Sequence, residues 1–132
     1  MRAGPSGHTS TLLAREAAAA PGLRLLVLHG SRARGDAHAR SDWDFGYQAD
    51  ASFDPDRLLG RLVEALSSDR VDLIDLDRAS ALLRYLTAAE GVAIYEHTPR
   101  AFEQFTIDAV TTWCDLAPVL EPAYAASLAR LH

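Results

Sequence analysis

Ten residues separate the pair Gly30-Ser31 from two aspartates, Asp42 and Asp44, that flank a single aromatic residue. Side chains alternate along a strand, so both carboxylates would point to one face, with Cα atoms roughly 6.6 Å apart at about 3.3 Å per residue. Magnesium is usually held by one or two carboxylates together with substrate phosphates. The glycine-serine pair offers backbone N–H groups open to close approach and a hydroxyl for a phosphate oxygen. The spacing therefore predicts a site for a metal–triphosphate complex.

A third carboxylate would let this site bind a second metal ion or use a general base. Asp72 is the predicted one, because a strand at 70–75 beside that of Asp42 and Asp44 would bring it next to the pair. Asp75 has the opposite parity and lies near the end of that strand, and it remains the alternative. Three clustered carboxylates repel one another, so without metal the pKa of at least one of them is expected to be raised.

Several other side chains near the glycine-serine pair are candidates for the site. Arg32 and Arg34 are predicted to contact the nucleotide, and Arg40 is a further source of positive charge. The five histidines show no metal-ligand spacing, and His29, at the end of an apolar run, is predicted to be structural rather than catalytic. Cys114 lies on an apolar-rich segment and is expected to be a small buried side chain.

The strands that must position these groups follow from periodicity. A nearly continuous apolar run at 23–29 is typical of a central strand buried on both faces. Strict alternation at 42–48 predicts a second strand whose three aromatic residues face the core. Shorter strands are predicted at 70–75 and, at a sheet edge, at 92–95. Between the first two strands, 32–40 is expected to form one helical turn and a loop.

Helices are predicted between the strands and at both ends of the chain. Asp54-Pro55 is typical of an N-cap followed by proline at the first helical position, and a leucine-rich stripe follows it to residue 66. Thr9 or Ser10 could cap the first helix. The other predicted helices lie at 12–20, at 78–90, from Thr98-Pro99 to a kink or restart at Pro118, and at 120–131.

Length and composition indicate one α/β domain of 132 residues, with 1–10 flexible, a core at about 23–113 and C-terminal helices at 99–131. The formal net charge of -5 argues against nonspecific binding to nucleic acid. The longest apolar runs are far shorter than the roughly 20 residues that span a bilayer, and no signal peptide is apparent. The single cysteine allows no internal disulfide, which fits a reducing cytoplasm, the expected compartment.

The spacing of Gly30, Ser31, Asp42 and Asp44 resembles the signature of the polymerase-β-like nucleotidyltransferases. Further similarity lies in the apolar segment that contains Asp72. Together with the short length, these motifs resemble those of the minimal nucleotidyltransferases, in particular the MntA-type antitoxins that pair with HEPN-domain toxins. The resemblance implies an α/β (α+β) fold with a small mixed sheet, flanking helices and C-terminal helices.

The resemblance also implies a reaction. ATP and Mg²⁺ would be bound, with two metal ions held by Asp42, Asp44 and Asp72, and AMP would be transferred with loss of pyrophosphate. In the antitoxin branch the acceptor would be a tyrosine hydroxyl of the partner toxin, an RNase silenced by the modification. A tyrosine hydroxyl has a pKa near 10, so a carboxylate base such as Asp72 is needed to take its proton.

Two other functions remain open at this point. The chain could be a binding module that keeps the fold and neutralises a partner by occlusion, with little or no chemistry. It could also transfer nucleotides to a small molecule, as aminoglycoside-modifying relatives do. The intact aspartates favour the enzyme over the pure binder, and little chain remains for the additional domain that aminoglycoside-type enzymes usually carry.

Overall fold

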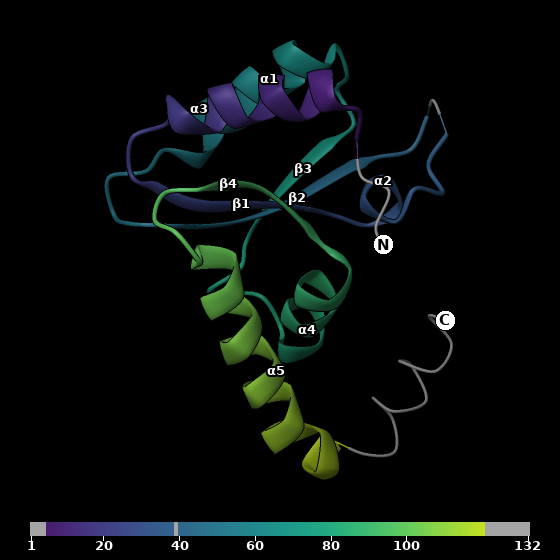
Figure 1. Ribbon diagram of the computed structural model, residues 1–132, viewed down its shortest axis with the longest axis vertical. Helices are drawn as coiled ribbons and strands as arrows, with labels where there is room; N and C mark the ends of the chain where they lie inside the picture. Colours follow the sequence, from purple (N-terminus) through teal and green to yellow (C-terminus); the bar gives the residue numbers. More distant parts are fainter. Residues whose placement is uncertain (1–4, 39, 121–132) are drawn as a thin grey trace.

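The computed structural model describes residues 5–38 and 40–120, which form one mixed sheet between helices (Figure 1). β1 pairs antiparallel with β2 and β4, whereas β2 pairs parallel with β3, in the spatial order β3-β2-β1-β4. The strands are β1 (Leu23–His29), β2 (Trp43–Ala49), β3 (Val71–Asp75) and β4 (Val92–Glu96). The predicted mixed sheet and the predicted edge position of the fourth strand are both confirmed.

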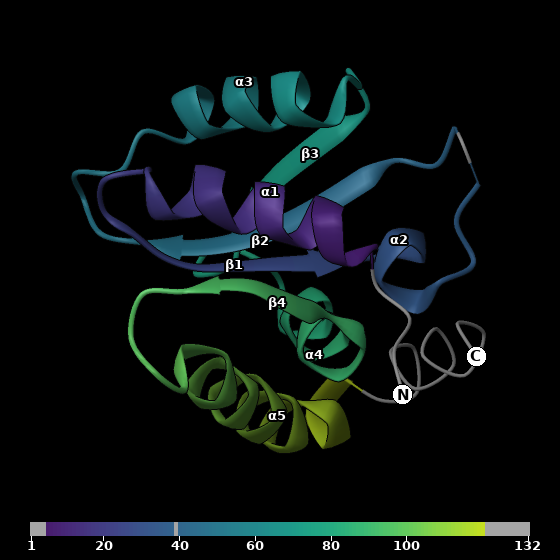
Figure 2. The same cartoon turned by 45° about the horizontal axis from the view of Figure 1, so that its top comes forward.

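Helices cover both faces of this sheet. Figure 2 shows two helices above it, α1 (Gly7–Ala18) and α3 (Pro55–Leu66), and two below it, α4 (Ala81–Glu90) and α5 (Ala101–Leu120). The single turn α2 (Ser31–Arg34) lies at the end of β1. It is the short helical turn that was predicted to precede a loop. The arrangement is therefore three layers, with the sheet in the middle.

The apolar run of β1 supplies the core on both sides. Leu26 and Leu28 pack in the cluster that includes α1 and α3, whereas Leu25 and Val27 pack in the cluster that includes α4 and α5. All four side chains are fully buried. This confirms the predicted central strand, because only a strand covered on both faces can bury consecutive apolar residues.

The two faces of β2 differ sharply in the size of their side chains. Phe45 is fully buried on the α1 and α3 side, where Trp43 and Tyr47 pack with it as predicted. On the opposite face lies Gly46, and a Cβ atom there would stand only 2.6 Å from Cδ2 of Leu76. The glycine therefore lets the residue that follows β3 pack directly on the strand.

Two helix starts differ from their predicted positions because other side chains cap them. α1 begins at Gly7, five residues earlier than predicted, since Oγ of Ser6 accepts a hydrogen bond from the N–H of Thr9 at 3.2 Å. Thr9 and Ser10 therefore lie inside the helix rather than at its cap. α4 begins at Ala81, because Ser80 caps it in the same way.

α5 departs from the prediction at its start, at Pro118 and on its exposed face. Pro99 lies before the helix, whose first turn is instead capped by Glu96, which accepts a hydrogen bond from the N–H of Phe102 at 3.0 Å. Within the described residues the helix continues through Pro118 to Leu120 rather than restarting at the proline. Cys114 is exposed, not buried as predicted.

The exposure of this cysteine follows from helix geometry. The buried stripe of α5 contains Phe105, Ala109 and Trp113, spaced four residues apart. The next residue is turned by about 100° from that stripe, because an α-helix has 3.6 residues per turn. The predicted final helix at 120–131 lies outside the described residues.

Candidate active site

The register of the sheet places three of the candidate residues side by side. Asp44 in β2 is the pairing partner of Asp72 in β3 and of His29 in β1. Since directly paired residues of neighbouring strands point to the same face, the two carboxylates and the imidazole lie together on the side of α4 and α5. The sequence predicted the two aspartates of this group, but not the histidine beside them.

The structure distinguishes Asp72 from its alternative. Asp75 pairs with Tyr47, whose ring packs on the α1 and α3 side of the sheet. Its Oδ1 accepts a hydrogen bond from the N–H of Asp77 at 2.9 Å, within the turn that follows β3. Asp75 thus belongs to the opposite face and to a turn, and Asp72 is the third carboxylate beside Asp44.

Gly30 joins the glycine-serine turn to the carboxylates. It has a φ of 72°, in the region that glycine tolerates best, and a Cβ atom there would stand 2.6 Å from Oδ2 of Asp44. The carbonyl of Gly30 accepts the first hydrogen bonds of α2, from Ala33 and Arg34. The turn predicted to bind phosphate therefore lies directly against the carboxylate predicted to bind metal.

The charges of this group act on one another. Burial is the main cause that raises the pKa of Asp44 above its ordinary value, and the carboxylates of Asp72 and Asp42 add to the rise, while His29 opposes it. Burial also lowers the pKa of His29, against the effect of Asp44. Nε2 of His29 is buried without a hydrogen-bond partner among the described residues. The expected rise in the pKa of one clustered carboxyl therefore falls on Asp44.

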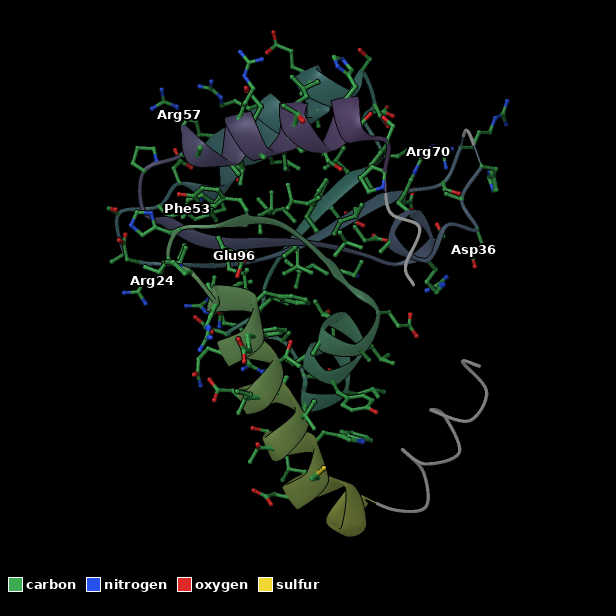
Figure 3. The ribbon with its side chains drawn as sticks, viewed as in Figure 1. Arg24, Asp36, Phe53, Arg57, Arg70 and Glu96 are labelled. Atoms are coloured by element: carbon green, nitrogen blue, oxygen red, sulfur yellow. The ribbon has the colours of Figure 1, made fainter. Side chains whose placement is uncertain are left out.

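Asp42 lies just before β2 and is more open to solvent than Asp44. Its Oδ1 is 3.8 Å from Nη1 of Arg70, and both side chains are more than half exposed. Figure 3 shows Arg70 and Asp36 near the end of the sheet where α2 lies, and Arg24 at the opposite end. An exposed pair of this kind contributes little stability, so Asp42 stays available to a ligand.

A cleft of about 270 Å³ opens beside Gly30, between α2 and α4. Arg34 crosses it, with Nη1 3.3 Å from Oε2 of Glu90 and Nε 3.4 Å from Oδ2 of Asp36. The remaining lining residues are His29, Leu83, Leu86 and Thr87. This cleft lies on the same side of the sheet as the carboxylates, and it brings the predicted Arg34 beside the predicted turn.

Arg32 points to a different place. Its Nη2 donates a hydrogen bond to the carbonyl of Ser41 at 2.9 Å, and its Cζ lies 4.2 Å from the centre of the Trp43 ring. The guanidinium is therefore engaged by protein groups. Arg40, the further candidate, is exposed, and its carbonyl accepts a hydrogen bond from Arg70.

The donor set of the site suits a hard cation. Among the described residues, no group of three His, Cys, Asp or Glu side chains is gathered closely enough to hold a metal ion by itself. Asp44 and Asp72 are nonetheless adjacent carboxylates, and a cation would offset both the burial that raises the pKa of Asp44 and the smaller effect of the neighbouring carboxylates. Magnesium usually takes only one or two carboxylates and completes its shell with phosphates and water. These residues therefore fit a metal ion that arrives with a nucleotide.

Comparison with known proteins identifies the family. The family model described as "Polymerase beta, Nucleotidyltransferase" matches residues 13–100, a span that includes every residue of the site. The chain belongs to this nucleotidyltransferase family. The predicted family and the predicted fold are thus confirmed.

A curated member of the nucleotidyltransferase family is similar in sequence. The protein adenylyltransferase MntA of Aphanizomenon flos-aquae is 34% identical over 98 residues, which are 64% of this chain and 65% of that protein. The matched region thus spans slightly less than two thirds of the relative.

Solved structures of toxin–antitoxin proteins share the fold. A crystal structure of a toxin–antitoxin with AMP-PNP matches with a TM-score of 0.64 and 26% identity, covering 86% of this chain and 94% of that one. A mutant MntA–HpeT toxin–antitoxin matches with a TM-score of 0.66 and 25% identity, covering 89% and 97%. That mutant has glutamate in place of two aspartates that are separated by a single residue, as Asp42 and Asp44 are.

The sequence missed two components of the site, His29 and the wall formed by α4. His29 comes beside Asp44 only through the antiparallel pairing of β1 and β2, and Glu90 comes beside Arg34 only through the packing of α4 under the sheet. The one sequence signal for His29 is its position directly before the glycine-serine turn.

None of the described helices is long and apolar enough to cross a membrane.

Proposed function

We propose that this chain is a magnesium-dependent nucleotidyltransferase that transfers AMP from ATP to a protein hydroxyl, a tyrosine of a cognate HEPN-type toxin, and so acts as an antitoxin. The observation that carries the proposal is the contact of Gly30 with Asp44, which itself pairs with Asp72. A phosphate-binding turn and adjacent carboxylates in one place suit phosphoryl chemistry. The similarity to an adenylyltransferase and to a toxin–antitoxin with AMP-PNP supports the choice of donor and partner.

The proposed reaction assigns a role to each residue. Gly30, Ser31 and Arg34 would bind the triphosphate through backbone N–H groups, a hydroxyl and a guanidinium. The tyrosine oxygen attacks the α-phosphorus, the bond from that phosphorus to the β-phosphate bridging oxygen breaks, and pyrophosphate leaves. Asp72 accepts the proton of the hydroxyl, because it lies beside Asp44 and is exposed to an incoming protein acceptor.

Asp42, Asp44 and Asp72 would hold magnesium, two ions in the full complex. When bound, the metal supplies positive charge that stabilises the attacking and leaving oxygens. Arg34 first has to exchange its contacts with Asp36 and Glu90 for phosphate oxygens, whose geometry matches the donors of a guanidinium as that of a carboxylate does. We place the reaction in the cytoplasm, where ATP and a toxin that is an RNase would be found.

The test uses ATP labelled at the α-phosphate, magnesium and the product of the adjacent reading frame, the proposed HEPN-type partner. We expect label on a tyrosine of that partner. The variants Asp42→Ala and Asp44→Ala should reduce transfer by at least about a thousandfold, since they remove the charge that binds the metal. Asp56→Ala is the control, because Asp56 is exposed in the first turn of α3, outside the site.

Other results would give a different function. Tight binding of the partner without label, together with full neutralisation by both alanine variants, would establish occlusion and overturn the enzyme. Transfer of label to an aminoglycoside but not to the partner would establish a small-molecule nucleotidyltransferase. Transfer at the wild-type rate by either variant would contradict the proposed metal ligands.

A further inference from the structure

Arg32 and Arg34 leave the same helical turn in opposite directions. Residues two apart in a helix are turned by about 200° from one another. Arg34 reaches the cleft on the carboxylate side and contacts Glu90 at 3.3 Å. Arg32 instead lies over the ring of Trp43, in a hollow that Ser6 and Thr9 at the start of α1 also line. The two arginines therefore serve different sides of the sheet.

The contacts of Arg32 converge on the backbone that carries the two aspartates. Nη2 donates to the carbonyl of Ser41 at 2.9 Å, directly before Asp42, and the guanidinium stacks over Trp43, directly before Asp44. Nε is buried without a partner among the described residues, so the group is enclosed between α2 and β2. Since Trp43 and Asp44 are consecutive residues of β2, Arg32 contacts the face of the strand opposite to that of Asp44.

We infer that Arg32 is a positioning residue that holds Ser41 and Trp43 against α2, and so fixes the carboxylates of Asp42 and Asp44 for the metal–nucleotide complex. The inference rests on the proposed function for the identity of that complex. A guanidinium suits this task because its planar group can stack on an aromatic ring while an edge N–H donates to a carbonyl. A lysine can satisfy one of these contacts, but not both in the same geometry.

The other hydrogen bonds of Ser41 and Trp43 among the described residues hold the loop to β3 or to itself and do not reach α2: the N–H of Trp43 donates to the carbonyl of Arg70 at 2.8 Å. Arg70 donates to the carbonyl of Arg40 at 3.2 Å, but its side chain is 57% exposed. Oγ of Ser41 accepts a hydrogen bond from the N–H of His38, which is local to the loop. Arg32 is therefore the main tie between the loop and the turn that begins with Gly30, and its loss should loosen the aspartates without unfolding the sheet.

The test compares Arg32→Met, Arg32→Lys and the control Arg57→Met, whose residue is exposed on α3. Hydrogen exchange of the segment 41–44 should accelerate about tenfold or more in Arg32→Met, while segments of α3 and α4 keep their rates. Calorimetry with magnesium and a non-hydrolysable ATP analogue should show metal affinity reduced about tenfold to a hundredfold, as for other residues that orient metal ligands. Arg32→Lys should restore neither the slow exchange nor the metal affinity fully. In all three variants, affinity for the analogue without metal should stay within about twofold of the wild-type value.

Two results would overturn the inference. If affinity for the analogue falls without metal in Arg32→Met and returns in Arg32→Lys, then Arg32 binds phosphate directly through its charge. If exchange at 41–44 is unchanged, then Arg32 does not hold this backbone. Failure of the proposed function appears separately, as a wild-type protein that binds the analogue but labels no partner, and the exchange measurement still decides the role of Arg32.

Discussion

Asp44 is the residue where the needs of folding and of chemistry conflict. It is partly buried, it pairs with a second carboxylate, and its contact with Gly30 leaves no room for a side chain at that turn. Burial and the neighbouring carboxylates raise its pKa, so its charged form destabilises the fold when no cation is present. A residue that destabilises the free protein but suits a bound metal is typical of a functional site.

This conflict predicts how Asp44→Asn changes stability with pH. Because the pKa of Asp44 is higher in the folded than in the unfolded protein, stability is lost as pH rises through the interval between those two values. In a chelator at neutral pH, the melting temperature of Asp44→Asn should therefore exceed that of the wild type by a few degrees. The difference should shrink at about pH 4 and below, where the unfolded carboxyl, with a pKa of about 3.9, is also protonated.

Magnesium supplies the matching control for Asp44→Asn. With nucleotide present, the metal should raise the melting temperature of the wild type more than that of the variant. A melting temperature below that of the wild type in chelator at neutral pH would instead mean that the ionised carboxylate makes a stabilising contact.

At the scale of elements, β2 both packs in the core and carries a site residue, because its two faces have very different side chains. One face is aromatic and packs under α1 and α3, while the other carries Asp44 and then Gly46, against which Leu76 is fully buried. A glycine here loses strand stability, but it lets the chain after β3 close over the sheet.

The substitution Gly46→Ala should cost about 1–3 kcal/mol in the free energy of unfolding, because Leu76 has no empty space to move into. Gly60→Ala is the matched control, since Gly60 is exposed in the middle of α3 with nothing within 4 Å of a new Cβ. That change should stabilise the protein by about 0.5–1 kcal/mol through helix propensity. Urea unfolding of both variants measures the two changes in the free energy of unfolding. If both variants are stabilised, or both destabilised, this account of Gly46 is contradicted.

At the scale of the whole molecule, one arginine ties the sheet to the helical layer that walls the cleft. Arg84 in α4 donates to the carbonyl of Leu76 after β3, pairs with Asp77 at 3.7 Å, and lies over the ring of Phe105 in α5. Gln48 in β2 donates to the same Asp77 at 2.9 Å. This network holds α4, and therefore Glu90 and the cleft, in place against the sheet.

Arg84→Met should lower the free energy of unfolding by about 1–3 kcal/mol, because it removes the charged donor to the carbonyl of Leu76 and the ion pair with Asp77. Arg78→Met is the matched control, since Arg78 is 89% exposed and its pair with Asp75 spans 3.9 Å. The control should change stability by less than about 0.5 kcal/mol. Chemical denaturation decides between them, and similar losses in both would show that the Arg84 network contributes nothing special.

Sequence alone determined the features that depend on local patterns. The alternation along 42–48, the apolar run of β1 and the cap at Asp54 each depend on side-chain parity or on a few adjacent residues. The same parity favoured Asp72, and the register places it beside Asp44, whereas Asp42 lies just before β2, outside the register. Helix ends were less predictable, because several nearby side chains could cap them, and Ser6 and Glu96 are the ones that do.

Only the tertiary structure decided which groups meet across strands and layers. Parity does not reveal that β1 pairs with β2 in the register that brings His29 to Asp44, nor that α4 packs where Glu90 reaches Arg34. The two arginines of α2 were equivalent in sequence, and the turn of the helix between them sends one to the cleft and the other to Trp43. Such contacts depend on the relative placement of elements distant in the chain, which no local pattern encodes.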